Sequence, residues 1–201
     1  MAVLLFSNKI SITNKLIPTV LNIISTRISN FYQSVRSGQN CVLNVDKSAF
    51  IQNYGKAIVM INPINIKINE TFFQYNSENV VHAKFSDDCL YDEQRSISIT
   101  NNEFESAMGN DICIEGIRNP KLNLSLFINK NNFLNNNTDG VLIFDLFYKQ
   151  FEINDNVFKK NKGNGLNIQK SFYSGKNNIY NNIKIRNNQF IENKGFGLFI
   201  N

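Results

Sequence analysis

Apolar residues recur at fixed distances from six phenylalanines, and this register constrains the fold more than any other feature of the chain. The anchors lie 23, 31, 29, 25 and 32 residues apart: Phe50, Phe73, Phe104, Phe133, Phe158 and Phe190. Positions seven and five before each anchor, and eight and ten after it, are apolar in all 24 cases. Periodicity of this length indicates a repeat architecture.

Each repeat therefore contains two apolar-x-apolar segments and one segment centred on the phenylalanine. Such alternation over three or four positions predicts β-strands with one buried face. Three short strands in a unit of about 25 residues cannot bury that face alone, so successive units must stack. We expect an all-β parallel β-helix of about six coils over residues 42–201, with equivalent positions about 4.8 Å apart.

Two polar columns keep the same register. Two residues before the anchors stand Ser48, Thr71, Asn102, Asn131, Asn156 and Asn188. Three residues after them stand Asn53, Asn76, Ala107, Asn136, Asn161 and Asn193. Asparagine tolerates the left-handed backbone of a sharp turn, and its amide can bond both its own turn and the asparagine of the next coil. The columns therefore predict stacked asparagine ladders at two corners.

The repeat can be written I-x-I-x-x-N-x-F-x-x-N-x-x-x-G-[LVI]-x-[IV], with its cleanest copies at Phe147–Gln169 and Asn182–Asn201. This pattern resembles the right-handed parallel β-helix repeat family of the pectate-lyase-like superfamily, over residues 42–201. The resemblance implies a right-handed, single-stranded parallel β-helix. The strand after the glycine would lie in the first sheet, the strand before the phenylalanine in the second, and the phenylalanine strand in the third.

Residues 1–41 fit the register poorly and are expected to form an N-terminal cap or irregular first coils. Apolar residues follow helical spacing from Ile17 to Val35, with Pro18 suited to a first helical turn. The alternative is one or two irregular coils, because Ile24, Thr26 and Phe31 echo the strand offsets. At the other end Asn201 directly follows a first-sheet strand. We expect further coils, a partner or a neighbouring subunit to cover that end, because open strand edges promote aggregation.

Two strings are similar to polygalacturonase motifs, but their arrangement argues against an enzyme. Asn137–Gly140 stands in the matching register, whereas the paired aspartates of Ser86–Cys89 come earlier in the chain, within loop 84–95. Asp139 is the only acid six residues after an anchor, in a column that reads Lys56, Asn79, Asn110, Asp139, Asn164 and Phe196. Glycoside hydrolysis needs two carboxylates. We expect no catalytic residues, no metal site and no cofactor.

The remaining acidic and basic residues are interpreted as solvated. The acidic loop residues Asp87, Asp88, Asp92 and Glu93 could bind a cation, but the interpretation favoured is a solvated loop. The outward column of the second sheet offers one carboxylate, Glu152, which is too few for calcium. The net charge is +5, and the one tight basic cluster, Lys159, Lys160 and Lys162, has no interleaved aromatic residues, so nucleic-acid binding is not expected. No apolar run reaches the length of about 18 residues that a membrane span needs.

The three cysteines, Cys41, Cys89 and Cys113, are odd in number and widely spaced. This usage favours reduced thiols and therefore an intracellular, cytoplasmic protein.

The outward column of the first sheet, nine residues after the anchors, is the candidate binding face. It reads Val59, His82, Cys113, Leu142, Asn167 and Phe199. Contiguous apolar surface usually marks a contact site, although a long turn folded over this face would also explain it. We expect a non-catalytic scaffold that binds protein partners or neighbouring subunits. The alternative is a carbohydrate-binding or polysaccharide-degrading β-helix, for which Phe199 and Asp139 are the visible candidates.

Overall fold

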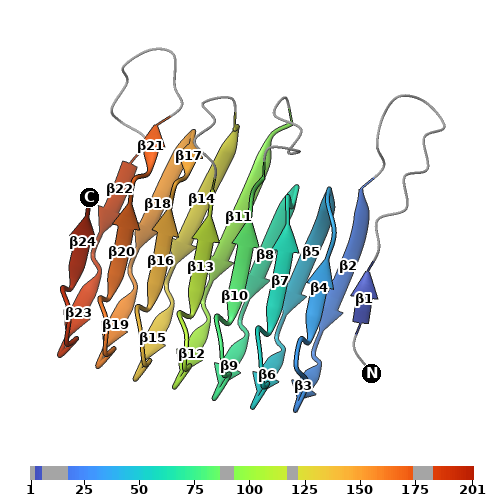
Figure 1. Ribbon diagram of the computed structural model, residues 1–201, viewed down its shortest axis with the longest axis horizontal. Helices are drawn as coiled ribbons and strands as arrows, with labels where there is room; N and C mark the ends of the chain where they lie inside the picture. Colours follow the sequence, from blue (N-terminus) through green and yellow to red (C-terminus); the bar gives the residue numbers. More distant parts are fainter. Residues whose placement is uncertain (1–2, 6–17, 87–92, 117–121, 174–182) are drawn as a thin grey trace.

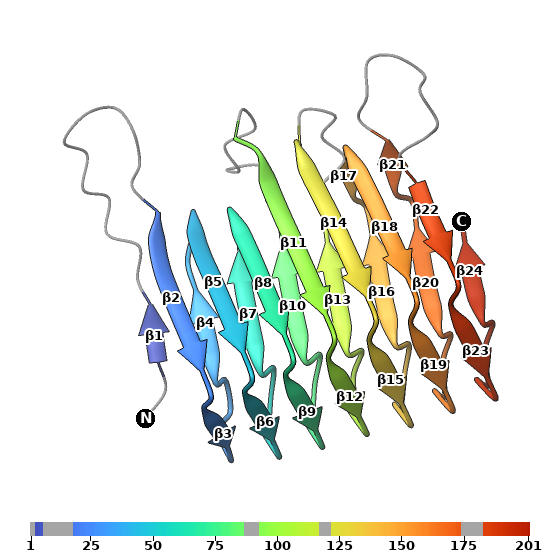
Figure 2. The same cartoon turned by 180° about the vertical axis from the view of Figure 1, so that it is seen from behind.

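The computed structural model describes residues 3–5, 18–86, 93–116, 122–173 and 183–201. Every regular element in these ranges is a β-strand, and the strands form three long parallel sheets (Figure 1). Seen from behind, the same coils follow one another along the long axis of the molecule (Figure 2). The predicted all-β parallel β-helix is confirmed. No helix able to cross a membrane occurs among these residues.

The first sheet has eight strands: β1 (Val3–Leu5), β4 (Val35–Ser37), β7 (Ile58–Ile61), β10 (Val81–Lys84), β13 (Ile112–Glu115), β16 (Val141–Phe144), β20 (Leu166–Gln169) and β24 (Leu198–Ile200). The second has seven: β2 (Thr19–Ile24), β5 (Cys41–Asp46), β8 (Asn65–Asn69), β11 (Arg95–Thr100), β14 (Leu124–Asn129), β18 (Gln150–Asn154) and β22 (Ile183–Arg186). The third also has seven: β3 (Arg27–Ser29), β6 (Ala49–Ile51), β9 (Phe72–Gln74), β12 (Glu103–Glu105), β15 (Asn132–Leu134), β19 (Val157–Lys159) and β23 (Gln189–Ile191). A short extra sheet joins β17 (Phe147–Tyr148) to β21 (Phe172–Tyr173).

The chain forms seven complete coils, one more than the six that the phenylalanine register predicts. Residues 19–37 make the additional first coil from β2, β3 and β4. Its anchor is Ile28, which pairs with Phe50, and Phe31 takes the position of a ladder asparagine. Its first-sheet strand begins seven residues after the anchor, whereas Ile58 follows Phe50 by eight. These departures hide the first coil from the repeat pattern.

The helix considered between Ile17 and Val35 is wrong for the described part, which begins at Pro18. Strand β2 instead pairs with β5 along six residues, which places Leu21 and Ile23 beside Leu43 and Val45. Strand pairing satisfies the backbone groups along the edge of β5, which the side of a helix would leave without partners. The β-branched residues of this segment also favour an extended backbone.

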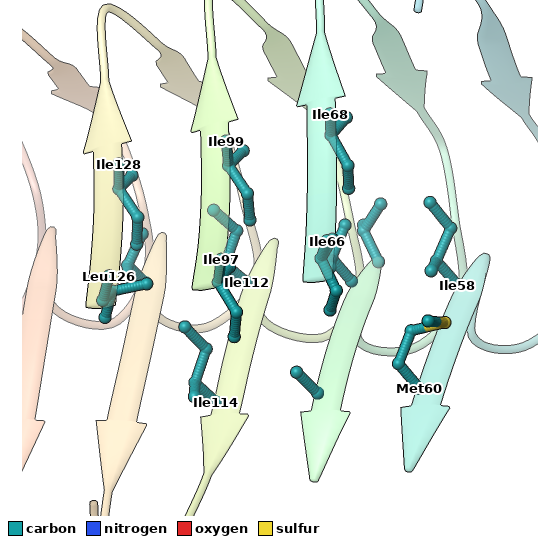
Figure 3. Packing of buried hydrophobic residues seen from close by; sticks show 14 of the residues in the cluster. Ile58, Met60, Ile66, Ile68, Ile97, Ile99, Ile112, Ile114, Leu126 and Ile128 are labelled. Carbon is teal, nitrogen blue, oxygen red and sulfur yellow. The ribbon is translucent and has the colours of Figure 1, made fainter. Parts of the chain in front are cut away.

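The interior is a continuous apolar core in which like residues stack upon like. Pairs of isoleucines and leucines from the first and second sheets meet between those sheets (Figure 3). All six anchor rings lie in one pile, with successive centroids 4.7 to 5.1 Å apart and planes within 16° of parallel. This spacing matches the separation of adjacent strands. Each aromatic pair contributes about 0.5–1.5 kcal/mol beyond its buried area.

The two expected asparagine ladders are present and point in one direction. In each, the side-chain oxygen of one coil accepts the backbone N–H of the equivalent residue in the preceding coil. For example, the Asn156 Oδ1 atom accepts from the backbone N of Asn131 at 2.9 Å and from its Nδ2 at 3.0 Å. The same Nδ2 also donates to the carbonyl of Ile99, at 2.8 Å. One buried amide thereby connects three coils.

The left-handed backbone does not fall on the ladder residues, as the sequence had suggested, but on the residue before each of them. In every coil the third residue before the anchor and the second residue after it have positive φ, as Lys130 (58°) and Asn135 (58°) show for Phe133. Several of these residues are not asparagine, for example Tyr75 and Glu192. Each costs about 1–2 kcal/mol of conformational energy. The ladder residue that follows each left-handed residue stabilises the turn through its side-chain hydrogen bonds.

A buried arginine adds a second kind of link at the corner between the first and second sheets. The side chain of Arg95 is fully buried and donates from Nη1 to the carbonyls of Asn62 (2.9 Å) and Pro63 (2.7 Å). Its Nη2 atom reaches the side-chain oxygen of Asn40, at 3.3 Å. A single guanidinium thus ties together the corners of three successive coils.

Replacing a ladder amide should destabilise the whole rod. We expect Asn131→Ala to lower the free energy of unfolding by about 3 kcal/mol, because it leaves the backbone N–H of Asn102 buried without an acceptor. Exposed Asn137 is the matched control, and Asn137→Ala should change stability by less than about 0.5 kcal/mol. Urea unfolding followed by circular dichroism measures both. Equal losses in the two variants would contradict the ladder's role.

Candidate functional site

The six residues predicted to share an outward row do lie side by side across the first sheet. Strand register places His82 between Val59 and Cys113, and continues the row through Leu142 and Asn167 to Phe199. Val59, Cys113 and Asn167 are buried, whereas the others are partly exposed. The accessible apolar part of this row is therefore centred on Leu142 and, at its end, on Phe199.

The middle of the row carries a small polar cluster. The Nε2 atom of His82 lies 3.3 Å from Oε2 of Glu115, whose Oε1 atom accepts from Lys84 at 2.9 Å. Burial alone would raise the pKa of Glu115, but Lys84 and His82 together hold it below its usual range. Burial and the nearby ammonium of Lys56 lower the pKa of His82, against the opposing hydrogen bond to Glu115. At neutral pH the cluster therefore consists of a neutral imidazole beside a carboxylate paired with Lys84.

Cys113 lies next to His82 across the strand pair, an arrangement that invites comparison with a cysteine–histidine nucleophile. Burial, aided by the negative charge of Glu115, raises the pKa of this thiol to about 11. The thiolate is the reactive form of cysteine, so a thiol held protonated is a poor nucleophile. The pair acts as packing within the row.

Alkylation measures this directly. At pH 8, iodoacetamide should modify Cys113 about a hundredfold more slowly in the folded protein than in urea, because its pKa of about 11 lies two units above the usual value of 9.0. Peptide mapping by mass spectrometry separates Cys113 from the other two cysteines. Rapid labelling of the folded protein would instead indicate a thiolate activated by His82.

Asp139, the one acid in its predicted column, belongs to a third ladder that the sequence interpretation missed. In this ladder the backbone N–H of the later coil donates to the side-chain oxygen of the earlier coil, opposite to the first two. The chain of donors and acceptors joins Asn79, Asn110, Asp139, Asn164 and Phe196. Asp139 also accepts from Nδ2 of Asn167, at 2.7 Å. The string Asn137–Gly140 therefore has a structural explanation.

Glycines beside this ladder are the signal that could have revealed it. An added Cβ at Gly163 would lie 2.4 Å from Oδ1 of Asp139, and one at Gly195 would lie 2.7 Å from Oδ1 of Asn164. Such contacts are too close for any side chain. Glycine one residue before a column of Asn and Asp therefore marks a corner where a side-chain oxygen lies against the backbone.

Of the acidic loop, only Glu93 falls among the described residues; Asp87, Asp88 and Asp92 lie outside them. The Oε2 atom of Glu93 is 3.6 Å from Nη2 of Arg95, so this carboxylate supports the buried guanidinium. Within the described ranges, no three His, Cys, Asp or Glu side chains are grouped so as to hold a metal ion.

Two further surface features are not apparent from the repeat. A groove of about 450 Å³ follows the corner between the second and third sheets, where Glu70, Glu103 and Lys130 line it. At the corner between the third and first sheets, large side chains project from four successive coils into solvent: Tyr32, Tyr54, Tyr75 and Met108. Both features consist of corner residues, which the apolar register does not constrain.

The last coil exposes residues that are buried in every coil before it. Ile200 is 62% exposed, whereas Ile168, its neighbour in β20, is 7% exposed. Leu198 is 39% exposed and Leu166 is fully buried. Phe196 stacks on Phe199 with centroids 5.6 Å apart and remains largely exposed.

Comparison with known proteins adds no family to these observations. No family model, curated protein or solved structure matches the chain. The resemblance of its repeat to the pectate-lyase-like superfamily stays a prediction.

Proposed function

We propose that this protein is a non-catalytic, rigid β-helical scaffold that holds protein partners or neighbouring subunits against the outward row of its first sheet. The observation that carries the proposal is the partial exposure of Leu142 and Phe199, two apolar side chains in the outward row of that sheet. Exposed apolar surface of this kind is typical of contact sites.

The geometry supports docking by apolar burial on the first sheet. A partner could cover the side chains of Leu142 and Phe199, which strands β16 and β24 hold in one row. Phe196 and Phe199 would serve as anchors, since aromatic residues dominate binding energy at interfaces. The stacked core behind them changes little in shape, so the chain would act as a spacer of fixed length.

Lysine substitutions on this surface test the proposal. The paired change Leu142→Lys with Phe199→Lys should reduce co-purification of partners at least about tenfold, because charges would be buried without partners at the contact. Affinity purification from the natural source with quantitative mass spectrometry measures the loss, and thermal unfolding verifies the fold. Ile24→Lys, which changes an exposed apolar side chain on the second sheet, is the control. Equal recovery from both variants would contradict the proposal.

The exposed tyrosines favour a second candidate function, carbohydrate binding, at a corner of the rod and not on the first sheet, where the sequence offered Phe199 and Asp139 as candidates. Tyr32 and Tyr54 occupy equivalent corners of adjacent coils and are 68% and 64% exposed. Their rings could stack on successive sugar units of a chain that runs along the rod.

Calorimetric titration with acidic polysaccharides, with and without calcium, distinguishes this candidate. If carbohydrate binds there, Tyr54→Ala should weaken binding about tenfold through loss of a stacking platform. Val20→Ala, which alters an exposed apolar residue on the second sheet, should leave binding unchanged. Absence of heat with every polysaccharide would remove this candidate and leave the scaffold proposal intact.

A further inference from the structure

The asparagine ladder formed by the residues three positions after the anchors, called the second ladder below, has a gap in the fourth coil, at Ala107. Elsewhere in the ladder a side-chain oxygen accepts the backbone N–H of the coil before, as Asn76 does for Asn53 at 3.2 Å. Alanine has no such oxygen. Among the described residues, the backbone N–H of Asn76 consequently has no hydrogen-bond acceptor. The gap lies in the middle of the rod, with three coils before it and three coils after it.

Asp111, four residues later in the same coil, turns its side chain into this region. The residue is completely buried, and its Oδ2 atom accepts from Nδ2 of Asn136. In other coils the corresponding amide donates to the carbonyl of an anchor phenylalanine, as Asn161 does to Phe133 at 3.3 Å. The carboxyl of Asp111 thus replaces a backbone acceptor, while its Oδ1 atom has no partner.

Asp111 occurs in the coil whose second-ladder position, Ala107, lacks a side-chain amide. At the equivalent position the other phenylalanine-anchored coils have small or apolar residues: Ala57, Val80, Gly140, Gly165 and Gly197. The first coil, which also lacks the ladder amide, shows a comparable compensation, because Ser34 donates its hydroxyl to Oδ1 of Asn53 at 2.8 Å. Polar side chains from the same turn therefore occupy positions near both gaps.

The environment of this carboxyl favours its neutral form. Burial raises the pKa of Asp111 well above its usual 3.8, and the hydrogen bond from Asn136 opposes this only in part. The adjoining coils present Asn76 and Val80 on one side and Asn136 and Gly140 on the other, none of which titrates. Among the described residues, no lysine or arginine lowers the pKa of Asp111.

We propose that Asp111 is a proton-controlled joint in the rod: its neutral carboxyl completes the turn between β12 and β13, and its ionisation opens that turn. The sign is opposite to that of a salt-bridged acid. Because the folded pKa is the higher one, this group's contribution to stability is complete below pH 3.8 and is lost as pH rises toward the folded pKa. The fourth coil would therefore be most stable at acidic pH and least stable at alkaline pH.

The experiment compares the wild type with Asp111→Asn, which keeps the shape but cannot ionise. From urea unfolding between pH 4 and pH 8, the ratio of the variant's folding constant to that of the wild type should rise by up to about tenfold per pH unit above 3.8, until the folded pKa is reached. Hydrogen exchange at the N–H of Ala107 and Met108 should show faster opening in the wild type than in the variant at pH 8. Asp155→Asn, at an exposed aspartate, is the control and should show no such trend.

A second variant keeps the test valid if Asp111→Asn fails to fold. The double change Ala107→Asn with Asp111→Gly restores the pattern of the later coils and should remove the same pH dependence. A stability ratio that stays constant from pH 4 to pH 8, or one that changes equally for Asp155→Asn, would overturn the proposal.

Discussion

The hydrogen bond between a side-chain oxygen and the backbone N–H of an adjacent coil is the interaction on which this structure depends. At the two corners that flank the third sheet a left-handed residue turns the chain, and the next N–H points along the rod, away from water. An asparagine in the neighbouring coil supplies the acceptor and also donates to a main-chain carbonyl. Without it, a buried donor would remain unsatisfied at each turn, at a cost of about 1–3 kcal/mol. The apolar strands can stack in register only because these corners are satisfied.

This dependence explains how different residues share the same position. In the ladder two residues before the anchors, the early coils carry hydroxyl side chains, whose oxygen replaces the amide oxygen: Thr26, Ser48 and Thr71. A hydroxyl accepts from the neighbouring N–H but lacks the amide's second donor. The ladder is consequently richer in hydrogen bonds in the later coils.

The repeat predicted the strands, their register and the anchor pile from residue 43 onward, because buried positions fix both spacing and residue type. The first coil could not be found in the same way, since Ile28 and Phe31 replace the phenylalanine and asparagine that define the pattern. The outward row was predicted correctly as a row, but its burial depends on neighbouring side chains and corners. The sequence interpretation treats Asp139 as a lone acid and assigns no role to Asp111. Their hydrogen bonds depend on residues one coil away, outside the window of any local motif.

Every ladder bond crosses a single coil boundary, and this has a consequence for how such a chain can change length. Inserting or deleting one entire coil leaves the new neighbours with the same donors and acceptors, since the equivalent residues again face each other. The connections between the first and second sheets already vary, and anchors are separated by 23 to 32 residues. Loss of part of a coil, in contrast, would shift every corner beyond it out of alignment. A chain of this architecture can therefore gain or lose whole coils, while the loops between coils vary freely in length.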